Sequence, residues 1–201
     1  MIFTDGRDLA TVLGPELYER VTDAMSGYGM PEMVIRTLKP WAIMAMLSMP
    51  KPSSDPILDL VLHQRAIDAG KPAAGLESAQ EQLSILDGLT LNEQISLLKT
   101  TLDQLPAIPK MTQQLLQAYI NDDLGQIVQI EKQYKDQNSS AVMKKFYNRL
   151  NTARNLRMVE RMQTYLQQGN SFIAIGALHL AGPEGLVALL RQKGYTVSSI
   201  R

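Results

Sequence analysis

The stretch from residue 90 to residue 168 constrains the fold more than any other part of the chain, because it carries almost no strand pattern. Apolar residues recur at spacings of three and four in LNEQISLLKTTLDQL, MTQQLLQAYINDD, LGQIVQIEKQYKDQ and AVMKKFYNRLNTARNLRMVERMQTYLQQG. This period is typical of amphipathic helices with one solvated face. We therefore expect an all-helical insertion, 90–168, within a single domain that spans residues 1–201.

Prolines punctuate the first third of the chain, which we also expect to be helical. Pro15 and Pro40 suit the first position of a helix, where the missing backbone N–H costs nothing. The run that Pro40 opens, PWAIMAMLSM, is apolar nearly all round and predicts a short buried helix. Pro50, Pro52 and Pro56 predict a turn-rich connector after it.

Strand patterns are confined to three short runs. PAAGLE at 72–77 precedes Ser78, which with Glu81 would start a helix through a capping box. SFIAIGA at 171–177 and YTVSSI at 195–200 flank the helical run PEGLVALLRQKG. A strand–helix–strand unit of this kind predicts parallel strands. We therefore predict an α/β fold that is mostly helical overall, with a small, largely parallel sheet and a C-terminal βαβ unit.

Composition and missing motifs exclude several classes. Twenty basic residues balance twenty acidic ones, so we expect no nucleic-acid partner. The absence of cysteine excludes disulfides, thiolate nucleophiles and cysteine zinc sites, and G-x-S-x-G, H-E-x-x-H, Walker and G-x-G-x-x-G motifs are also absent. No apolar run reaches the roughly 18 residues of a transmembrane segment. The N-terminus, MIFTDGRDLA, lacks the features of a signal peptide, so as written the chain is expected to be cytoplasmic.

His179, one of two histidines, stands where the predicted strand FIAIGA ends and a helix is expected to begin. Ligands of open α/β sheets bind at that edge, and the small residue Gly176 would let a substrate approach. We predict Gly182 as the helix N-cap and Pro183 as its first residue. The alternative is a loop histidine that is hydrogen-bonded to the chain.

Glu77 occupies a matching position, after the short strand and before the capped helix. A carboxylate beside an imidazole could form an acid–base pair or bind a metal ion. The alternative is a solvated glutamate favoured by the helix dipole.

Arg154 lies within an apolar row of the last long helix, four residues from Leu150 and from Met158. A guanidinium on such a face needs a carboxylate or an anionic substrate, unless its side chain extends along the row to water. Asn155 offers a second polar contact beside it.

The run FIAIGALHLAGPEGLVALLRQKGYTV resembles the closing segment of the TraB/GumN family, which is related to the Tiki proteases. LKPWA at 38–42, GKPAAGLESAQEQL at 70–83 and NTARNLRM at 151–158 match other blocks of the family in the same order. The resemblance implies an α/β core with a large helical insertion, shared with erythromycin-esterase-like proteins. It also implies a hydrolase-like site.

In Tiki relatives this site is a metal-dependent protease site with two glycine-x-x-histidine motifs. The resemblance matches His179 to the second motif, Glu77 to a glutamate after the short strand and Arg154 to the arginine of the helical block. We therefore expect three catalytic residues: His179 would bind a divalent ion (Mn, Co or Zn) or act as base, Glu77 would be a metal ligand or general base, and Arg154 would hold a carboxylate or oxyanion. Asn155 and Gly176 would contact substrate.

The first glycine-x-x-histidine motif of the family, usually within G-T-x-H, has no counterpart in this sequence. We therefore expect a family member that begins after that motif. A longer precursor with a signal sequence would be periplasmic or in the cell envelope.

Three hypotheses follow for the function. The first is a metal-dependent, peptidase-like hydrolase, which the shortened form could render inactive. The second is a non-catalytic protein that binds a peptide or small ligand in the same cleft, and the third is a fragment without independent function. The sequence does not give the oligomeric state.

Overall fold

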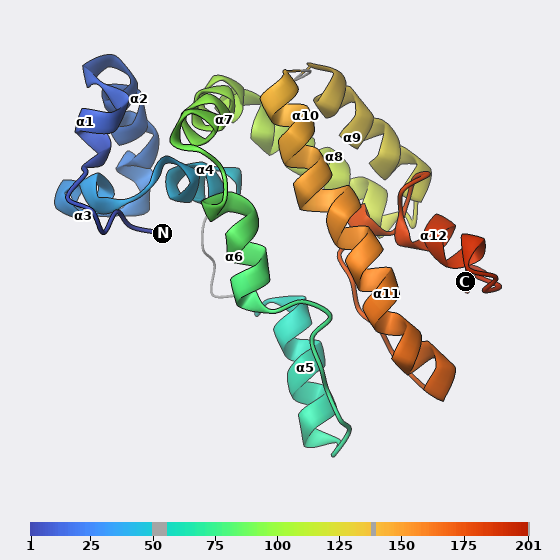
Figure 1. Cartoon of the computed structure of the whole chain (residues 1–201). Coiled ribbons are helices and arrows are strands. Elements are labelled where there is room, and N and C mark those ends of the chain that lie inside the picture. The colour runs from blue at the N-terminus through green and yellow to red at the C-terminus, as the bar shows by residue number, and fades with distance from the viewer. Residues whose placement is uncertain (50–55, 138–139, 201) are drawn as a thin grey trace.

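The computed structural model describes residues 1–49, 56–137 and 140–200, and these residues form a helical assembly (Figure 1). The α-helices of the first half are α1 (Leu9–Leu13), α2 (Pro15–Met25), α3 (Glu32–Thr37), α4 (Pro40–Ser48), α5 (Leu58–Asp68), α6 (Ala79–Asp87) and α7 (Leu91–Gln104). Those of the second half are α8 (Ile108–Ile120), α9 (Leu124–Gln137), α10 (Ala141–Tyr147), α11 (Ala153–Gln168) and α12 (Leu186–Gln192). Short 3-10 turns lie at Ser26–Tyr28, Leu105–Ala107 and Ala177–His179, and a π-helical turn at Asn148–Thr152 joins α10 to α11.

The N-terminal core forms around α4, which is buried as its composition predicts. Its residues Trp41, Ala42 and Ile43 are each at most 2% exposed, and the helix packs against α7. Trp41 donates its indole N–H to Asp87 Oδ1 at 2.8 Å, so the polar atom of this buried ring is satisfied. Pro15 opens α2, as predicted, and Figure 1 shows α1 to α3 gathered at one end of the molecule.

Capping interactions fix where two central helices begin. Ser78 accepts the backbone N–H of Glu81, whose carboxylate accepts the N–H of Ser78, which confirms the predicted capping box at α6. Thr90 and Glu93 form the same arrangement at α7. Helices α7 to α11 fill the described part of residues 90–168, as their periodicity predicts, while the interpretation of this segment as an insertion stays a prediction.

The predicted α/β fold with a parallel sheet is wrong. The described residues contain no strand, and their only β-type pairing is an isolated antiparallel bridge between Ile2 and Leu38. Residues 171–175 make no backbone–backbone hydrogen bond to another described residue. Because alternating apolar residues indicate only a half-buried extended segment, the pattern could not show whether a neighbouring strand completes a ladder.

The predicted strands instead pack their apolar side chains on helices. Leu76, Ile173 and Ile175 lie against a small core made by α11 and α12, which also buries Met158 and Leu186. This packing brings the segments 72–77 and 171–177 to α11, although no sheet joins them.

The helix after His179 also begins later than predicted. It starts at Leu186 with Gly185 as its N-cap, whereas Gly182 and Pro183 lie in the preceding loop. A Cβ at Gly185 would lie 2.2 Å from the carbonyl oxygen of Ala181, so only glycine fits this position. The close turn at residues 181–185 therefore displaces the start of the helix.

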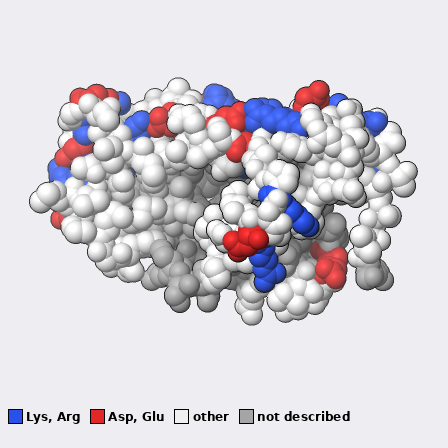
Figure 2. Space-filling model, turned by 90° about the horizontal axis from the view of Figure 1, so that it is seen from below, with Lys and Arg blue, Asp and Glu red and all other residues white. Residues whose placement is uncertain are grey.

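Pro50 and Pro52 of the predicted connector lie outside the described residues. Within the described ranges, no helix is long and apolar enough to cross a membrane. Figure 2 shows basic and acidic side chains interspersed across a mostly uncharged face.

Candidate functional site

Helix α11 carries the polar residues of the candidate site in its first turn, next to a buried apolar row. Met158, Val159 and Met162 are at most 4% exposed, and Arg154 and Asn155 precede them on the helix. The π-helical turn Asn148–Thr152 enters α11 directly before these residues. Single π turns within α-helices are frequent at functional sites.

Glu77 is held between two arginines of α11. Arg154 donates from Nε to Oε2 of Glu77 at 2.9 Å and from Nη2 to the same oxygen at 2.7 Å. Arg157 Nη2 donates to Oε1 at 3.2 Å. The side chain of Glu77 is 3% exposed, against 16% for Arg154 and 41% for Arg157. The carboxylate that Arg154 needs is thus that of Glu77, because a charge in such surroundings must be paired.

The two arginines keep Glu77 ionised at neutral pH. Burial alone would raise the pKa of its carboxyl group, but the hydrogen bonds and charges of Arg154 and Arg157 outweigh burial and lower the pKa below its ordinary value. This carboxylate therefore accepts hydrogen bonds and is not a proton donor near pH 7.

Asn155 sets the tautomer of the neutral His179 ring. It is 2% exposed, and its side-chain N–H donates to the backbone carbonyl of Glu184 at 2.7 Å. Its Oδ1 therefore faces Nδ1 of His179, at 2.6 Å. Because Oδ1 can only accept, Nδ1 of His179 carries the proton and donates it. The neutral ring then has its lone pair on Nε2, where it can accept a proton or bind a metal ion.

His179 is neutral at pH 7. Burial lowers the pKa of its imidazole, and the positive charge of Arg154 lowers it further, while Glu77 and Glu131 act in the opposite direction. Glu77 and Arg154 thus belong to the electrostatic surroundings of His179. The sequence analysis placed Glu77 and His179 at one sheet edge and Arg154 on a helix, whereas in the structure α11 brings the three residues together.

The loop at residues 181–185 fixes the other side of this network. Thr152 donates its hydroxyl to Oε2 of Glu184 at 2.8 Å, while the carbonyl of Glu184 holds Asn155. The sequence analysis missed Glu184, because its contact with Asn155 runs through the main chain. It also missed Arg157, although Arg157 lies three positions after Arg154 and this spacing places both on one helix face.

Gly176, predicted to contact substrate, lies at the start of the 3-10 turn that carries His179. A Cβ at this position would meet only Cδ2 of His179, at 3.9 Å, which is an ordinary contact. The structure therefore does not require glycine here, and the predicted substrate contact stays a prediction.

The described residues do not fit a metal centre. They contain no group of three or more His, Asp or Glu side chains arranged to hold a metal ion. Glu77, the second predicted ligand, has both carboxylate oxygens engaged by arginines. His179 would be left as a single donor, whereas zinc sites use three or four protein ligands.

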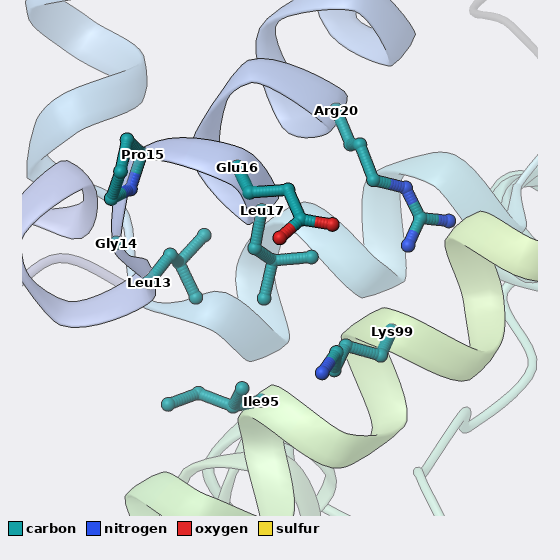
Figure 3. A pocket seen from close by; sticks show the side chains of 8 residues that line it. All are labelled: Leu13, Gly14, Pro15, Glu16, Leu17, Arg20, Ile95 and Lys99. Atoms are coloured by element: carbon teal, nitrogen blue, oxygen red, sulfur yellow. The ribbon is translucent and has the colours of Figure 1, made fainter.

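Two shallow hollows lie on the described surface. One, of about 350 Å³, has Leu13, Leu17 and Ile95 on its apolar side and Glu16, Arg20 and Lys99 around it (Figure 3). It lies between α1, α2 and α7 and includes no predicted site residue. The other, of about 360 Å³, includes Thr152 and Glu184 and so borders the His179 network.

The fold and the site together define a helical protein in which a buried arginine–glutamate cluster adjoins an oriented, neutral histidine. The profile of the TraB/PrgY/gumN family matches residues 1–199. The chain therefore belongs to the TraB/PrgY/gumN family, which confirms the resemblance seen in its sequence blocks.

Curated relatives add a link to proteases. The chain is 29% identical to "Metalloprotease TIKI1" of Danio rerio over 164 residues, which are 71% of this chain and 33% of that protein. It is 29% identical to "Metalloprotease TIKI1" of Xenopus tropicalis over 165 residues and 28% identical to "Metalloprotease TIKI2" of Danio rerio over 165 residues, in each case 71% of this chain and 32% of the relative. The chain thus matches about a third of the length of these relatives. No solved structure matches it.

Proposed function

We propose that this chain contributes a peptidase-like hydrolytic site in which His179 is the general base. One observation carries the proposal: the Asn155 amide fixes the proton of His179 on Nδ1 and leaves Nε2 free to accept one. The names of the curated relatives, which describe metalloproteases, support a peptide substrate.

In this site, Nε2 of His179 takes a proton from a water molecule while the water oxygen attacks the carbonyl carbon of the peptide. The same nitrogen then gives the proton to the departing amine as the C–N bond breaks. Asn155 keeps the ring in its reactive tautomer, and Arg154 disfavours the imidazolium form at rest. Arg154 itself holds Glu77 and is not free to bind substrate.

The predicted divalent ion (Mn, Co or Zn) has no part in these steps, because the described residues contain no group of three or more His, Asp or Glu side chains arranged to hold it. Its requirement is tested by assaying the chain with each ion and with a chelator. Equal activity in all of these conditions supports a base that works without metal.

The test is cleavage of a mixed peptide substrate by the 201-residue chain and by two histidine variants. His179→Ala should lower the rate by about 10²- to 10⁴-fold, the contribution that a positioned general base makes. His63→Ala is the matched control, since His63 is the other histidine and is exposed on α5. A His179→Ala rate equal to that of the unaltered chain contradicts the proposal.

A second function, peptide binding without cleavage, is favoured by the engagement of Glu77. A carboxylate with both oxygens bound to arginines suits a rigid framework better than a reacting group. This function predicts no cleavage by the unaltered chain. It also predicts peptide binding that survives His179→Ala and is lost in Arg154→Ala, because the framework that Arg154 and Glu77 form is then broken.

A further inference from the structure

The hollow that borders the His179 network opens between α9, α10, the π-helical turn and the 181–185 loop. Its volume is about 360 Å³, and it is lined by Lys135, Asp136, Lys144, Tyr147, Asn148, Thr152 and Glu184. Thr152 and Glu184 also belong to the hydrogen bonds that orient Asn155 and His179. A molecule bound in this hollow would therefore contact two residues of the hydrogen-bond network that orients the proposed base.

The two lysines of the hollow differ in how their charges are used. Lys135 lies 2.7 Å from the carboxylate of Glu131 and 5.3 Å from the centroid of the Tyr147 ring, so its ammonium already has partners. Lys144 is exposed and forms no ion pair with another described residue. Lys144 is thus the cation that is available to a ligand.

The remaining walls offer groups that suit a peptide better than a simple anion. Asp136 brings a second negative charge besides Glu184, and both disfavour a ligand that is only negative. The same carboxylates can accept backbone N–H groups, which a peptide supplies. Burial, with smaller contributions from Tyr134 and Glu131, raises the pKa of Tyr147, so this wall presents a neutral phenol.

We propose that this hollow is a substrate subsite that binds a carboxylate-bearing segment of a peptide, with Lys144 contacting the carboxylate. The proposal rests on the peptide substrate proposed above and adds the chemistry that selects it. The carboxylate can be the C-terminus of the peptide or an acidic side chain, and both sources offer the same group to Lys144.

The test measures peptide binding by calorimetry in the His179→Ala chain, so that cleavage cannot interfere. Three probes are compared: a short N-acetylated alanine peptide with a free C-terminal carboxylate, its C-terminal amide, and the amide with one alanine replaced by glutamate. The carboxylate peptide should bind about two- to fivefold more tightly than the amide, as expected of an exposed ion pair. The glutamate peptide shows whether an acidic side chain serves equally.

Lysine variants assign the effect to the hollow. Lys144→Gln should remove the preference for the carboxylate, whereas Lys132→Gln should leave it unchanged. Lys132 is the matched control because it is an exposed lysine of α9 that is not among the residues lining the hollow. Equal binding of the carboxylate and amide peptides, an equal effect of Lys132→Gln, or no binding of any probe overturns the proposal.

The outcome is separable from that of the hydrolase. Cleavage that depends on His179, without a carboxylate preference, refutes the subsite and leaves the hydrolase standing. If the carboxylate peptide is preferred but the unaltered chain cleaves no peptide, the hydrolase is refuted and peptide binding is supported as the function of the hollow.

Discussion

Replacing Arg154 with methionine removes the principal partner of Glu77 while keeping a long apolar side chain on α11. Arg154 donates three of the four hydrogen bonds from arginines to the Glu77 carboxylate, at 3.2, 2.9 and 2.7 Å. Arg157 makes the fourth, at 3.2 Å. The variant therefore leaves a carboxylate that is 3% exposed with one weaker, more solvated partner.

The size of the effect follows from this geometry. Removing one partner of a buried ion pair lowers the free energy of unfolding by about 3–5 kcal/mol when the other charge is left uncompensated. Since Arg157 still contacts Glu77, we expect a loss of about 2–4 kcal/mol for Arg154→Met. Arg157→Met, the matched control, removes a residue that is 41% exposed and should cost about 0–1 kcal/mol.

Urea unfolding followed by circular dichroism measures these differences, with the slope checked for constancy. Adding Glu77→Gln to Arg154→Met should recover part of the loss, because the variant then buries no unpaired charge. Arg154→Met and Arg157→Met losses that agree within about 0.5 kcal/mol would refute the reasoning, because the deeper arginine would then contribute no more than the exposed one.

Three further predictions concern pH and the loop beside the site. The folded-state pKa of Glu77 is lowered, so the ionised carboxylate stabilises the fold fully above the ordinary carboxyl pKa, and this stabilisation is lost as pH falls through the folded-state pKa. A Glu77→Gln chain should therefore lose less stability than the unaltered chain in acid-unfolding curves. An unchanged curve would contradict this prediction. The folded-state pKa of His179 is also lowered, so the stability of the fold should fall as pH drops below about 6.5, the ordinary imidazole pKa. His179→Gln should flatten this part of the curve of stability against pH. An identical slope in the variant would count against a buried neutral ring. Gly185→Ala should lower the free energy of unfolding by about 2–4 kcal/mol, because the added Cβ would meet a backbone oxygen. Gly176→Ala, the control, should change the free energy of unfolding by less than about 0.5 kcal/mol. Thermal unfolding measures both variants, and a mild effect at Gly185 would refute the close turn.

The sequence predicted the helices well because their signals are local. Apolar spacing, the proline before Trp41 and the Ser78–Glu81 capping box each act within a few residues of the helix they define. Whether the extended segments pair into a sheet could not be predicted from such local signals. Ile173 and Ile175 alternate as a strand would, but alternation does not show whether a second strand or a helix surface covers them, and here α11 and α12 do.

The candidate site was predicted in part. The position of Arg154 within an apolar row predicted a carboxylate partner, and in the structure Arg154 forms an ion pair with Glu77. The catalytic and metal-binding roles of Glu77, Arg154 and His179 stay predictions. Arg157 could have been found from its spacing to Arg154, whereas Glu184 became visible only in the folded chain. The carbonyl of Glu184 that holds Asn155 has no sequence signature, since every residue carries the same main-chain oxygen.

The central claim is that Asn155 holds His179 as a neutral base with its lone pair on Nε2. Long-range ¹H–¹⁵N NMR of the imidazole at pH 7 tests this claim most directly, in a His63→Gln chain that leaves His179 as the single histidine. We predict a ring protonated on Nδ1 alone, and a mixture of tautomers when Asn155→Ala is added. A ring protonated on Nε2, or on both nitrogens, would contradict the account.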